Sequence, residues 1–365
     1  MKKTYLYLML AALVACGCAK TPSTGLNDAA KRYFDAWIHV NHPDAKPTGL
    51  GSYIIEEQVG TGAVAGDADD TPYVLADYTL RGLDGTVQET TSELVAQQVG
   101  TYDPADFYGP EVWQRGGNAL PAGLDEVVSG MRVGGTVKFA TPGWLQTNSR
   151  YDDAKGYLAN VSGTPVIYEV ALRELIPDVK KWEADSIGRY LDRHFPAKSP
   201  SDSLGFGFYY IQTGAPSSDR TMPTDTTIYI NYTGRLLDGT VFDTTIKDTA
   251  KFYGIYSASR TYGPVSVEWY SASEDDEDYS DITMSSSSII EGFAFTLYQM
   301  HPHEKGTGIF TSNWGYKADG SGSTIPGFSP LRFDVEIVDK PRRASWQPEA
   351  ARRRLNSEPA RSEPC

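Results

Sequence analysis

Cysteine is nearly absent from this sequence, with three residues among 365, and two of these lie at positions 16 and 18. Only Cys365 follows them, so the folded part of the chain cannot rest on a framework of disulfides. Histidine is also scarce, at five residues. Neither residue type recurs at the spacing of a metal site, and no convincing catalytic triad is visible. The sequence therefore predicts a protein without a bound metal or a nucleophilic centre.

An excess of positive charge is missing as well. The chain has 33 Lys and Arg against 47 Asp and Glu, which gives a net charge of −14. Because affinity for nucleic acid depends largely on neutralising phosphates with Lys and Arg, this balance argues against a nucleic-acid partner. Beyond residue 15 no apolar run is long enough to be a transmembrane helix.

The first 18 residues have the features of a secretion signal. Two lysines precede an apolar run at residues 5–15, which is too short to span a bilayer comfortably. The segment resembles a bacterial lipoprotein signal, in which cleavage leaves a lipid-modified N-terminal cysteine. Cys16 fits best because Leu13 lies three residues before it, and Cys18 is the alternative. A plain signal peptide with incidental cysteines stays open; several acyl chains on one cysteine would hold the protein at a membrane.

The composition favours strands and turns over a helical bundle. The chain contains 35 Gly, 22 Pro and 23 Tyr, and 40% of its residues are apolar, which is enough to bury real cores. Its length suits about two domains of ordinary size.

The sequence also contains one module twice. ADYTLRGLDGTVQET at residues 76–90 matches INYTGRLLDGTVFDT at 230–244, and similar pairs flank both segments in the same order. A repeat of this length is far too long for a solenoid and indicates duplicated domains. Each copy is preceded by a short amphipathic helix, expected at 29–40 and 182–195. The predicted parts are a signal peptide at 1–18, a tether at 19–28, domains at 29–178 and 179–339, and a disordered basic tail at 340–365.

The second copy of the repeat predicts a hairpin. Apolar and polar residues alternate along 228–233, which is the period of a half-buried strand. Asp238-Gly239 then gives the strongest short hairpin signal, because Gly accepts a positive φ. The hairpin brings three unlike side chains together: Tyr232, Phe242 and Asp243.

Two features of the second half do not repeat in the first. Residues 247–287 have the character of an insertion, and its acidic stretch at 273–278 suggests calcium. That stretch lacks the glycine and the alternating oxygen ligands of an EF-hand, so a solvated loop is the better interpretation. His301 and His303 stand two residues apart, but no third ligand follows at a recognisable spacing, and a metal is not expected there.

Four motifs of the second half occur in the order of a known family: L-L-D-G-T-V-F-D, I-I-E-G-F, I-P and L-R-F-D-V-E-I. They resemble the FKBP-type peptidyl-prolyl isomerases. The resemblance covers about residues 205–339 well and 50–175 more faintly. It implies an α+β fold in which a curved antiparallel sheet wraps one short helix, with the ligand pocket between them. With a lipid anchor, the layout is similar to that of FKBP-like lipoproteins of Gram-negative bacteria, especially Bacteroidetes.

The resemblance implies a set of pocket residues in the second half. Those matched as catalytic are Tyr232, Phe242, Asp243, Ile290, Phe293 and Tyr316. The N–H of Ile290 would bond a substrate carbonyl, Phe293 stands where the family usually has a tryptophan at the pocket floor, and the hydroxyl of Tyr316 would bond the peptide. Those matched as the remaining substrate-binding wall are Ile289, Ile325 and Phe333. A further aromatic position could fall on Trp269 or Val267, and the segment 247–287 leaves that alignment open.

These residue types suit prolyl isomerisation. Amide resonance sets a barrier of about 18–20 kcal/mol to peptide-bond rotation, and X-Pro bonds exchange over tens to hundreds of seconds. The twisted transition state has lost resonance and is less polar, so a dry aromatic pocket can favour it by differential binding. No cofactor, metal or nucleophile is required, and Asp243 would orient the pocket without transferring a proton.

The first half departs from the family pattern. Tyr78 is kept, but Gln88-Glu89 replace the Phe-Asp pair. Leu124 replaces the floor aromatic and Tyr168 the closing phenylalanine. No tyrosine clearly matches Tyr316, although Trp144 and Tyr151 are near. An unpaired amide in an apolar pocket costs a few kcal/mol, so this domain is expected to keep the fold with little or no activity.

The leading hypothesis is a cell-envelope prolyl isomerase that acts on proline-containing segments of unfolded or secreted proteins, with its active pocket in the second domain. Lipidation would place it on a bacterial membrane, at the outer membrane or the periplasmic face. The alternatives are a non-catalytic FKBP-like chaperone or surface adaptor, and a structural lipoprotein in which the folds are spacers.

Overall fold

The computed structural model describes residues 25–66, 72–198, 207–220, 226–269, 283–284 and 287–341. It divides into two compact units, Met1–Trp182 with Asp319–Phe328, and Glu183–Ala318 with Ser329–Cys365. The signal sequence with Cys16 and Cys18, the acidic stretch 273–278 and the tail after residue 341 lie outside the described residues. No helix within the described part of the chain is long and apolar enough to cross a membrane.

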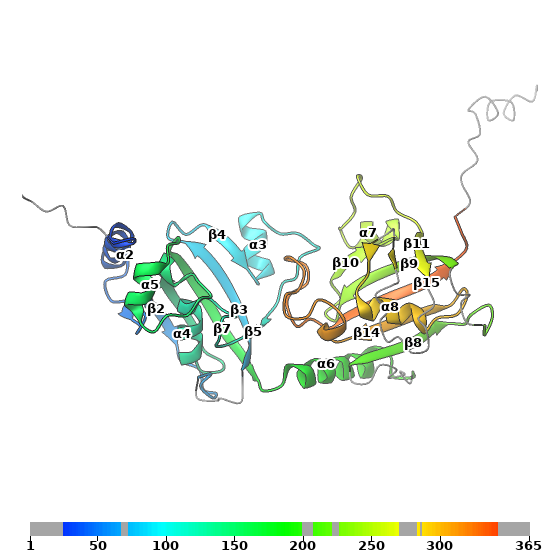
Figure 1. Ribbon diagram of the computed structural model, residues 1–365, viewed down its shortest axis with the longest axis horizontal. Coiled ribbons are helices and arrows are strands. Elements are labelled where there is room, and N and C mark those ends of the chain that lie inside the picture. The colour runs from blue at the N-terminus through cyan, green and yellow to red at the C-terminus, as the bar shows by residue number, and fades with distance from the viewer. Residues whose placement is uncertain are drawn as a thin grey trace, which may run out of the picture. The chain divides into compact units, whose positions relative to one another are not determined.

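The first unit forms a seven-stranded antiparallel sheet with short helices (Figure 1). Its elements in chain order are α2 (Asp28–Asn41), β1 (Lys46–Pro47), β2 (Tyr53–Gln58), β3 (Tyr73–Gly82), β4 (Val87–Thr90), α3 (Glu93–Val99), β5 (Glu111–Gln114), α4 (Ala122–Gly130), β6 (Thr136–Thr141), the 3-10 turn η1 (Gly143–Leu145), α5 (Ala154–Asn160) and β7 (Val166–Ile176).

The second unit contains an eight-stranded antiparallel sheet. Its elements are α6 (Val179–His194, whose first four residues belong to the first unit), β8 (Phe208–Gly214), β9 (Thr226–Leu236), β10 (Val241–Thr244), α7 (Lys247–Phe252), β11 (Val265–Trp269), β12 (Thr283–Met284), β13 (Ser287–Ser288), α8 (Glu291–Tyr298), β14 (Lys305–Phe310), the 3-10 turn η3 (Ser312–Trp314) and β15 (Leu331–Val338).

Both units have one topology. In the first sheet β2, β6, β7, β3 and β4 are neighbours in that order, and β8, β14, β15, β9 and β10 repeat this order in the second. β5 and β11 pair with β3 and β9 at the equivalent place. The predicted α+β class and the predicted duplication of a strand order are confirmed.

A short helix lies against each sheet and supplies the core. In the first unit Leu124, Val127 and Val128 of α4 pack against Phe139 and other buried strand residues. In the second unit nearly the whole of α8 is buried, from Gly292 to Leu297. Consecutive residues of an α-helix point to all of its sides, so burial from Gly292 to Leu297 means that the rest of the unit covers most of the circumference of α8.

The predicted hairpins form in both units. Gly85 and Gly239 have φ of 85° and 102°, the left-handed region that their turns require. Each returning strand contains a β-bulge, at Gln88 in the first unit and at Phe242 in the second. Because a bulge re-aims the side chains around it, the same device sets the direction of both residues.

The segment 247–287 is not simply an insertion. Its first part forms α7 and β11, and Val265 of β11 pairs with Ile230 of β9. The first unit has the same elements, α3 and β5, so this part belongs to the repeated module. The sequence alone indicates an insertion because the residues between helix and strand differ so strongly between the copies. Val267, one of the two candidates for the further aromatic position, is fully buried against β9, and the side chain of Trp269 lies outside the description.

Candidate functional site

The hairpin of β9 and β10 brings its three predicted residues together. Asp243 pairs with Gly234 across the ladder, directly after the bulge that carries Phe242. A Cβ at Gly234 would lie 2.5 Å from the ring of Phe242 and 2.9 Å from that of Phe333. Both rings can therefore occupy this place only because residue 234 has no side chain. In the first unit the equivalent residue is Leu80, which pairs with Glu89.

Four aromatic rings form one cluster beside this hairpin. The ring centroid of Phe333 lies 4.6 Å from that of Phe293 and 5.7 Å from that of Phe242, and Phe293 lies 5.3 Å from Tyr232. Phe293 and Phe333 are buried, whereas Phe242 is partly exposed. The cluster thus has a closed apolar base and one open aromatic edge.

The polar side of the site is a chain of three groups. The hydroxyl of Tyr232 donates a hydrogen bond to one oxygen of Asp243, and the guanidinium of Arg260 forms an ion pair with the other oxygen. Burial, followed by the charge of Asp243, raises the pKa of the Tyr232 hydroxyl, so it stays protonated and remains a donor. Desolvation lowers the pKa of Arg260, but the hydrogen bond and charge of Asp243 outweigh it and raise that pKa overall.

Arg260 was not expected from the sequence. It lies in a loop that is closed by Tyr256 stacking on Tyr262 at 5.5 Å and by the Ser257 N–H donating to the Tyr262 hydroxyl at 3.0 Å. Its signal is visible only when the two copies are aligned on Y-G-P, where Arg260 takes the place of Asp106.

The first unit builds the same loop with the opposite charge. Tyr102 stacks on Tyr108 at 5.4 Å, and the Asp103 N–H donates to the Tyr108 hydroxyl at 3.1 Å. Asp106 of this loop lines one cavity together with Glu89, the acid of the hairpin. Charge pairing of the kind made by Asp243 and Arg260 cannot occur between these two carboxylates.

Tyr316 and the start of α8 complete the site. Burial, followed by the charge of Asp243, raises the pKa of Tyr316, which places the phenol within electrostatic reach of that carboxylate. Within the described residues the N–H of Ile290 meets no hydrogen-bond acceptor, while its carbonyl caps α8 by accepting from Phe293 and Ala294. A peptide carbonyl could therefore bind at Ile290. Ile289 is partly exposed beside it.

Ile325 lies elsewhere. It is 3% exposed and belongs to the first unit, where it lines a cavity together with Tyr78, Gln88 and Glu89. The I-P motif thus gave no guide to its place, because it stands in a long loop whose course neither periodicity nor a turn motif determines.

The equivalent site of the first unit has different chemistry. The hydroxyl of Tyr78 donates to Glu89 at 3.1 Å, and that of Tyr168 donates to the amide oxygen of Gln146 at 2.9 Å. Burial, then the charge of Glu89, raises the pKa of Tyr168 to about 12. Trp144 and Tyr151, the two aromatics near the expected tyrosine position, pack instead in a separate cluster under α2.

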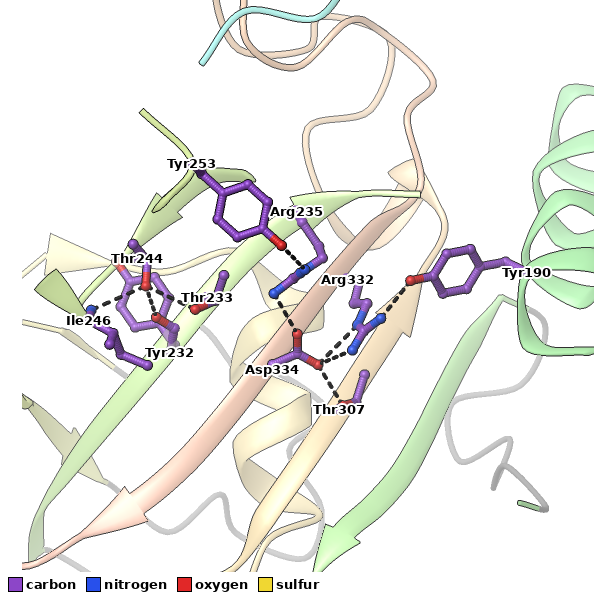
Figure 2. A network of polar contacts seen from close by, with 10 residues as sticks. All are labelled: Tyr190, Tyr232, Thr233, Arg235, Thr244, Ile246, Tyr253, Thr307, Arg332 and Asp334. Atoms are coloured by element: carbon purple, nitrogen blue, oxygen red, sulfur yellow. Dashed lines mark hydrogen bonds and ion pairs between the residues drawn. The ribbon is translucent and has the colours of Figure 1, made fainter. Parts of the chain in front are cut away.

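A polar network fastens the outer face of the second sheet (Figure 2). Asp334 of β15 forms ion pairs with Arg235 at 3.2 Å and with Arg332 at 2.7 Å. Arg332 also donates to the hydroxyl of Tyr190 at 2.6 Å, so the network includes helix α6. Since Phe333 points to the opposite face of the strand, this network supports the aromatic cluster from behind.

The two histidines contact separate acids. The Nδ1 atom of His301 lies 3.0 Å from Glu304, and the Nε2 atom of His303 lies 2.9 Å from Asp339. In the described part of the chain, no three residues among His, Cys, Asp and Glu are grouped as metal ligands.

Glu183 of α6 is a buried acid that was not predicted from the sequence. It is 2% exposed and accepts hydrogen bonds from Ser312. The sequence position of Glu183 indicates its burial, because it precedes Ile187 and Tyr190 by four and seven residues and so lies on the buried face of the helix. Burial raises the pKa of Glu183 to about 7 from an ordinary value of 4.5, although the Ser312 bonds lower it.

Glu183 should make the stability of the second unit depend on pH. The folded state holds this proton more tightly than the unfolded chain does, so the contribution is complete below about pH 4.5 and is lost as the pH rises through about 7. We expect the free energy of unfolding to fall by about 3 kcal/mol across this interval. Urea unfolding at several pH values would measure it. Glu183→Gln should remove this part of the slope, and equal slopes in both proteins would refute the assignment.

A comparison with known proteins covers part of this site. A family model described as FKBP-type peptidyl-prolyl cis-trans isomerase matches residues 268–338, which include Ile290, Phe293, Tyr316 and Phe333. Through this segment the chain is similar to the FKBP-type family.

The relatives cover parts of the chain. A macrophage infectivity potentiator of Trypanosoma cruzi is 26% identical over 152 residues, which make up 42% of this chain and 62% of that protein. The chain thus spans about three fifths of that relative. Among solved structures, the three FKBP domains of wheat FKBP73 are 15% identical and cover 79% of this chain and 94% of their own, with a TM-score of 0.28. FkpA from Escherichia coli is 22% identical and covers 44% and 62%, with a TM-score of 0.29.

Proposed function

We propose that the second unit is a prolyl cis-trans isomerase that binds proline-containing segments of other proteins. The observation that supports the proposal is that one site combines the open aromatic edge at Phe242 with hydrogen-bond donors that are held in place. A proline ring would pack on the aromatic cluster, and its neighbouring carbonyls would meet the Ile290 N–H and the Tyr316 hydroxyl.

The arrangement suits a reaction without covalent chemistry. The rotating amide loses polarity at the transition state, so an apolar surface favours that state over the planar ground state. Tyr232, Asp243 and Arg260 satisfy one another, so each group is held in place at the edge of the pocket. Held groups need not reorganise during the rotation, which is the advantage of a preorganised site.

The direct test is the rate of X-Pro isomerisation in a short peptide, measured by NMR exchange with the full chain. The proposal requires acceleration that depends on Phe242. A rate equal to that of the free peptide would contradict it.

For the first unit we propose non-catalytic peptide binding at most. The specific observation is the change of residues at matched positions, with Gln88 at the bulge, Glu89 beside it and Asp106 on the loop. These place an amide and two acids where the second unit has a ring and an ion pair. Binding of unfolded peptides by a protein with Phe242→Ala would support this role. A further fall in its kcat/KM when Gln88→Ala is added would place turnover in the first unit and contradict it.

We also propose that Cys16 is lipidated and holds the protein at a bacterial cell envelope. This rests on the sequence before residue 18 alone. Replacing Cys16 with Ser should move the protein from the membrane fraction to the soluble fraction of expressing cells, while Cys18→Ser should leave it in place. The reverse pattern would assign lipidation to Cys18, and membrane association in both variants would exclude a single-cysteine anchor.

A further inference from the structure

The isomerase chemistry proposed above does not use the buried acid of helix α6. The carboxylate of Glu183 accepts hydrogen bonds from the N–H of Ser312 at 2.5 Å and from its hydroxyl at 2.7 Å. Carboxylates are almost never fully buried unless they are paired, and hydrogen bonds to an ionised acceptor are the stronger kind. The pair therefore fixes Ser312 relative to the helix.

Ser312 in turn holds the backbone on both sides of Tyr316. Its carbonyl oxygen accepts hydrogen bonds from the N–H of Gly315 at 2.8 Å and from that of Lys317 at 2.9 Å. Lys317 has a φ of 55°, a left-handed conformation that a residue with a Cβ adopts only where its surroundings impose it. The bond to Ser312 supplies that constraint. The direction of Tyr316 thus depends on where Ser312 is held.

The first unit makes the equivalent turn without an acid. There the N–H of Gln146 donates to the carbonyl of Gly143 at 3.1 Å, as that of Gly315 does to Ser312. Gly143 has no hydroxyl, and helix α2 meets this turn through Phe34, whose ring contacts Trp144 edge-on at 6.0 Å. An apolar contact therefore suffices to form the turn. The acid and the hydroxyl are additions in the second unit, where the turn carries Tyr316.

The addition also has a cost. Burial raises the pKa of Glu183 to about 7, so the ionised carboxylate weakens the folded state at neutral pH. Groups that oppose stability are found mostly where a site requires them. A role in the site explains Glu183 better than a role in folding.

We propose that Glu183 is a positioning residue for Tyr316, which acts through Ser312 and ties the pocket to helix α6. This inference rests on the proposed isomerase function of that pocket. The helix has a second attachment to the same sheet, where Arg332 donates to the hydroxyl of Tyr190. With both attachments in place, the helix acts as a rigid brace for the Tyr316 turn.

The first experiment does not depend on activity. Hydrogen exchange of single amides is measured by NMR in the full chain and in three variants, Glu183→Ala, Glu183→Gln and Ser312→Gly. The amides of Gly315 and Lys317 should exchange about tenfold faster in Glu183→Ala and in Ser312→Gly, the residue type that the first unit has. Glu183→Gln keeps an acceptor oxygen and should fall between. Unchanged exchange in all three variants would overturn the proposal.

The second experiment separates positioning from general destabilisation. Glu183→Ala should lower kcat/KM for a short X-Pro peptide by about tenfold, a loss that corresponds to 1.4 kcal/mol. In a Tyr316→Phe background the same substitution should cause no further loss, because the group that it positions is gone. A loss of equal size in both backgrounds would overturn the proposal.

The two experiments also distinguish failure of the inference from failure of the proposed function. A wild-type protein without isomerase activity, combined with the expected exchange rates, would remove the proposed function and leave the tie between Glu183 and the Tyr316 turn. Activity with unchanged exchange rates would do the opposite.

Discussion

Replacing Phe310 with alanine should lower the free energy of unfolding of the second unit by about 3–5 kcal/mol. The ring is fully buried and lies 5.9 Å from Phe333 and 6.2 Å from Phe208 in stacked pairs. A Cβ at Gly292 of α8 would meet this ring at 2.5 Å, so helix and strand touch directly through it. Removing the ring would leave a cavity between α8 and the sheet that neither backbone can close without breaking the β14 ladder.

The measurement should report on the second unit alone, because a chain of two units need not unfold in one step. Hydrogen exchange of β14 and β15 amides in increasing urea meets this need. Phe252, which is 82% exposed, provides the matched control, and Phe252→Ala should change the same quantity by less than about 0.5 kcal/mol. Equal effects of the two substitutions would mean that Phe310 is not the core contact described above.

Replacing Phe242 with alanine should lower kcat/KM for an X-Pro peptide by about five- to thirtyfold. The ring forms the open edge of the aromatic cluster, and losing its contact with a proline ring should cost about 1–2 kcal/mol of transition-state binding. Because the ring is partly exposed, stability should change less than in Phe310→Ala. The effect should appear mainly in kcat if the contact forms only with the twisted amide, and in KM if it forms equally with the planar one.

The chain contains its own control for this experiment. Gln88 occupies the equivalent bulge of the first unit, and Gln88→Ala should leave kcat/KM unchanged. A fall of similar size in Gln88→Ala would place turnover in the first unit and contradict the assignment to the second. Full activity in Phe242→Ala would contradict a proline site at this hairpin.

The parts of the fold that the sequence predicted well are those determined by local patterns. The hairpin follows from alternation and an Asp-Gly turn, and the apolar-polar alternation of L-R-F-D-V-E-I is that of the final strand, Leu331–Val338. Short-range periodicity is sufficient for both because neighbouring residues determine them. The bulge cannot be predicted in this way, because it depends on how two strands pair. It falls at Phe242, where the two copies of the repeat differ.

The missed residues act across long stretches of sequence. Arg260 reaches Asp243 from a loop, and Glu183 reaches Ser312 across 129 positions. No local pattern encodes such contacts, although comparing the two copies exposes the first, and an acid on an apolar helix face hints at the second. Ile325 shows the opposite case, in which the I-P motif is visible in the sequence but does not determine where the residue lies in the fold.

The loop closed by stacked tyrosines in each unit bears on how the two copies could diverge. A stacked pair of tyrosines closes the loop in each unit, Tyr102 with Tyr108 and Tyr256 with Tyr262. The matched loop residue is Asp106 in the first unit and Arg260 in the second, so the loop accepts a side chain of either charge without a change of backbone. A duplicated gene segment could lose or regain a counter-ion at the pocket by substitutions at a single codon, while the architecture around it was inherited intact.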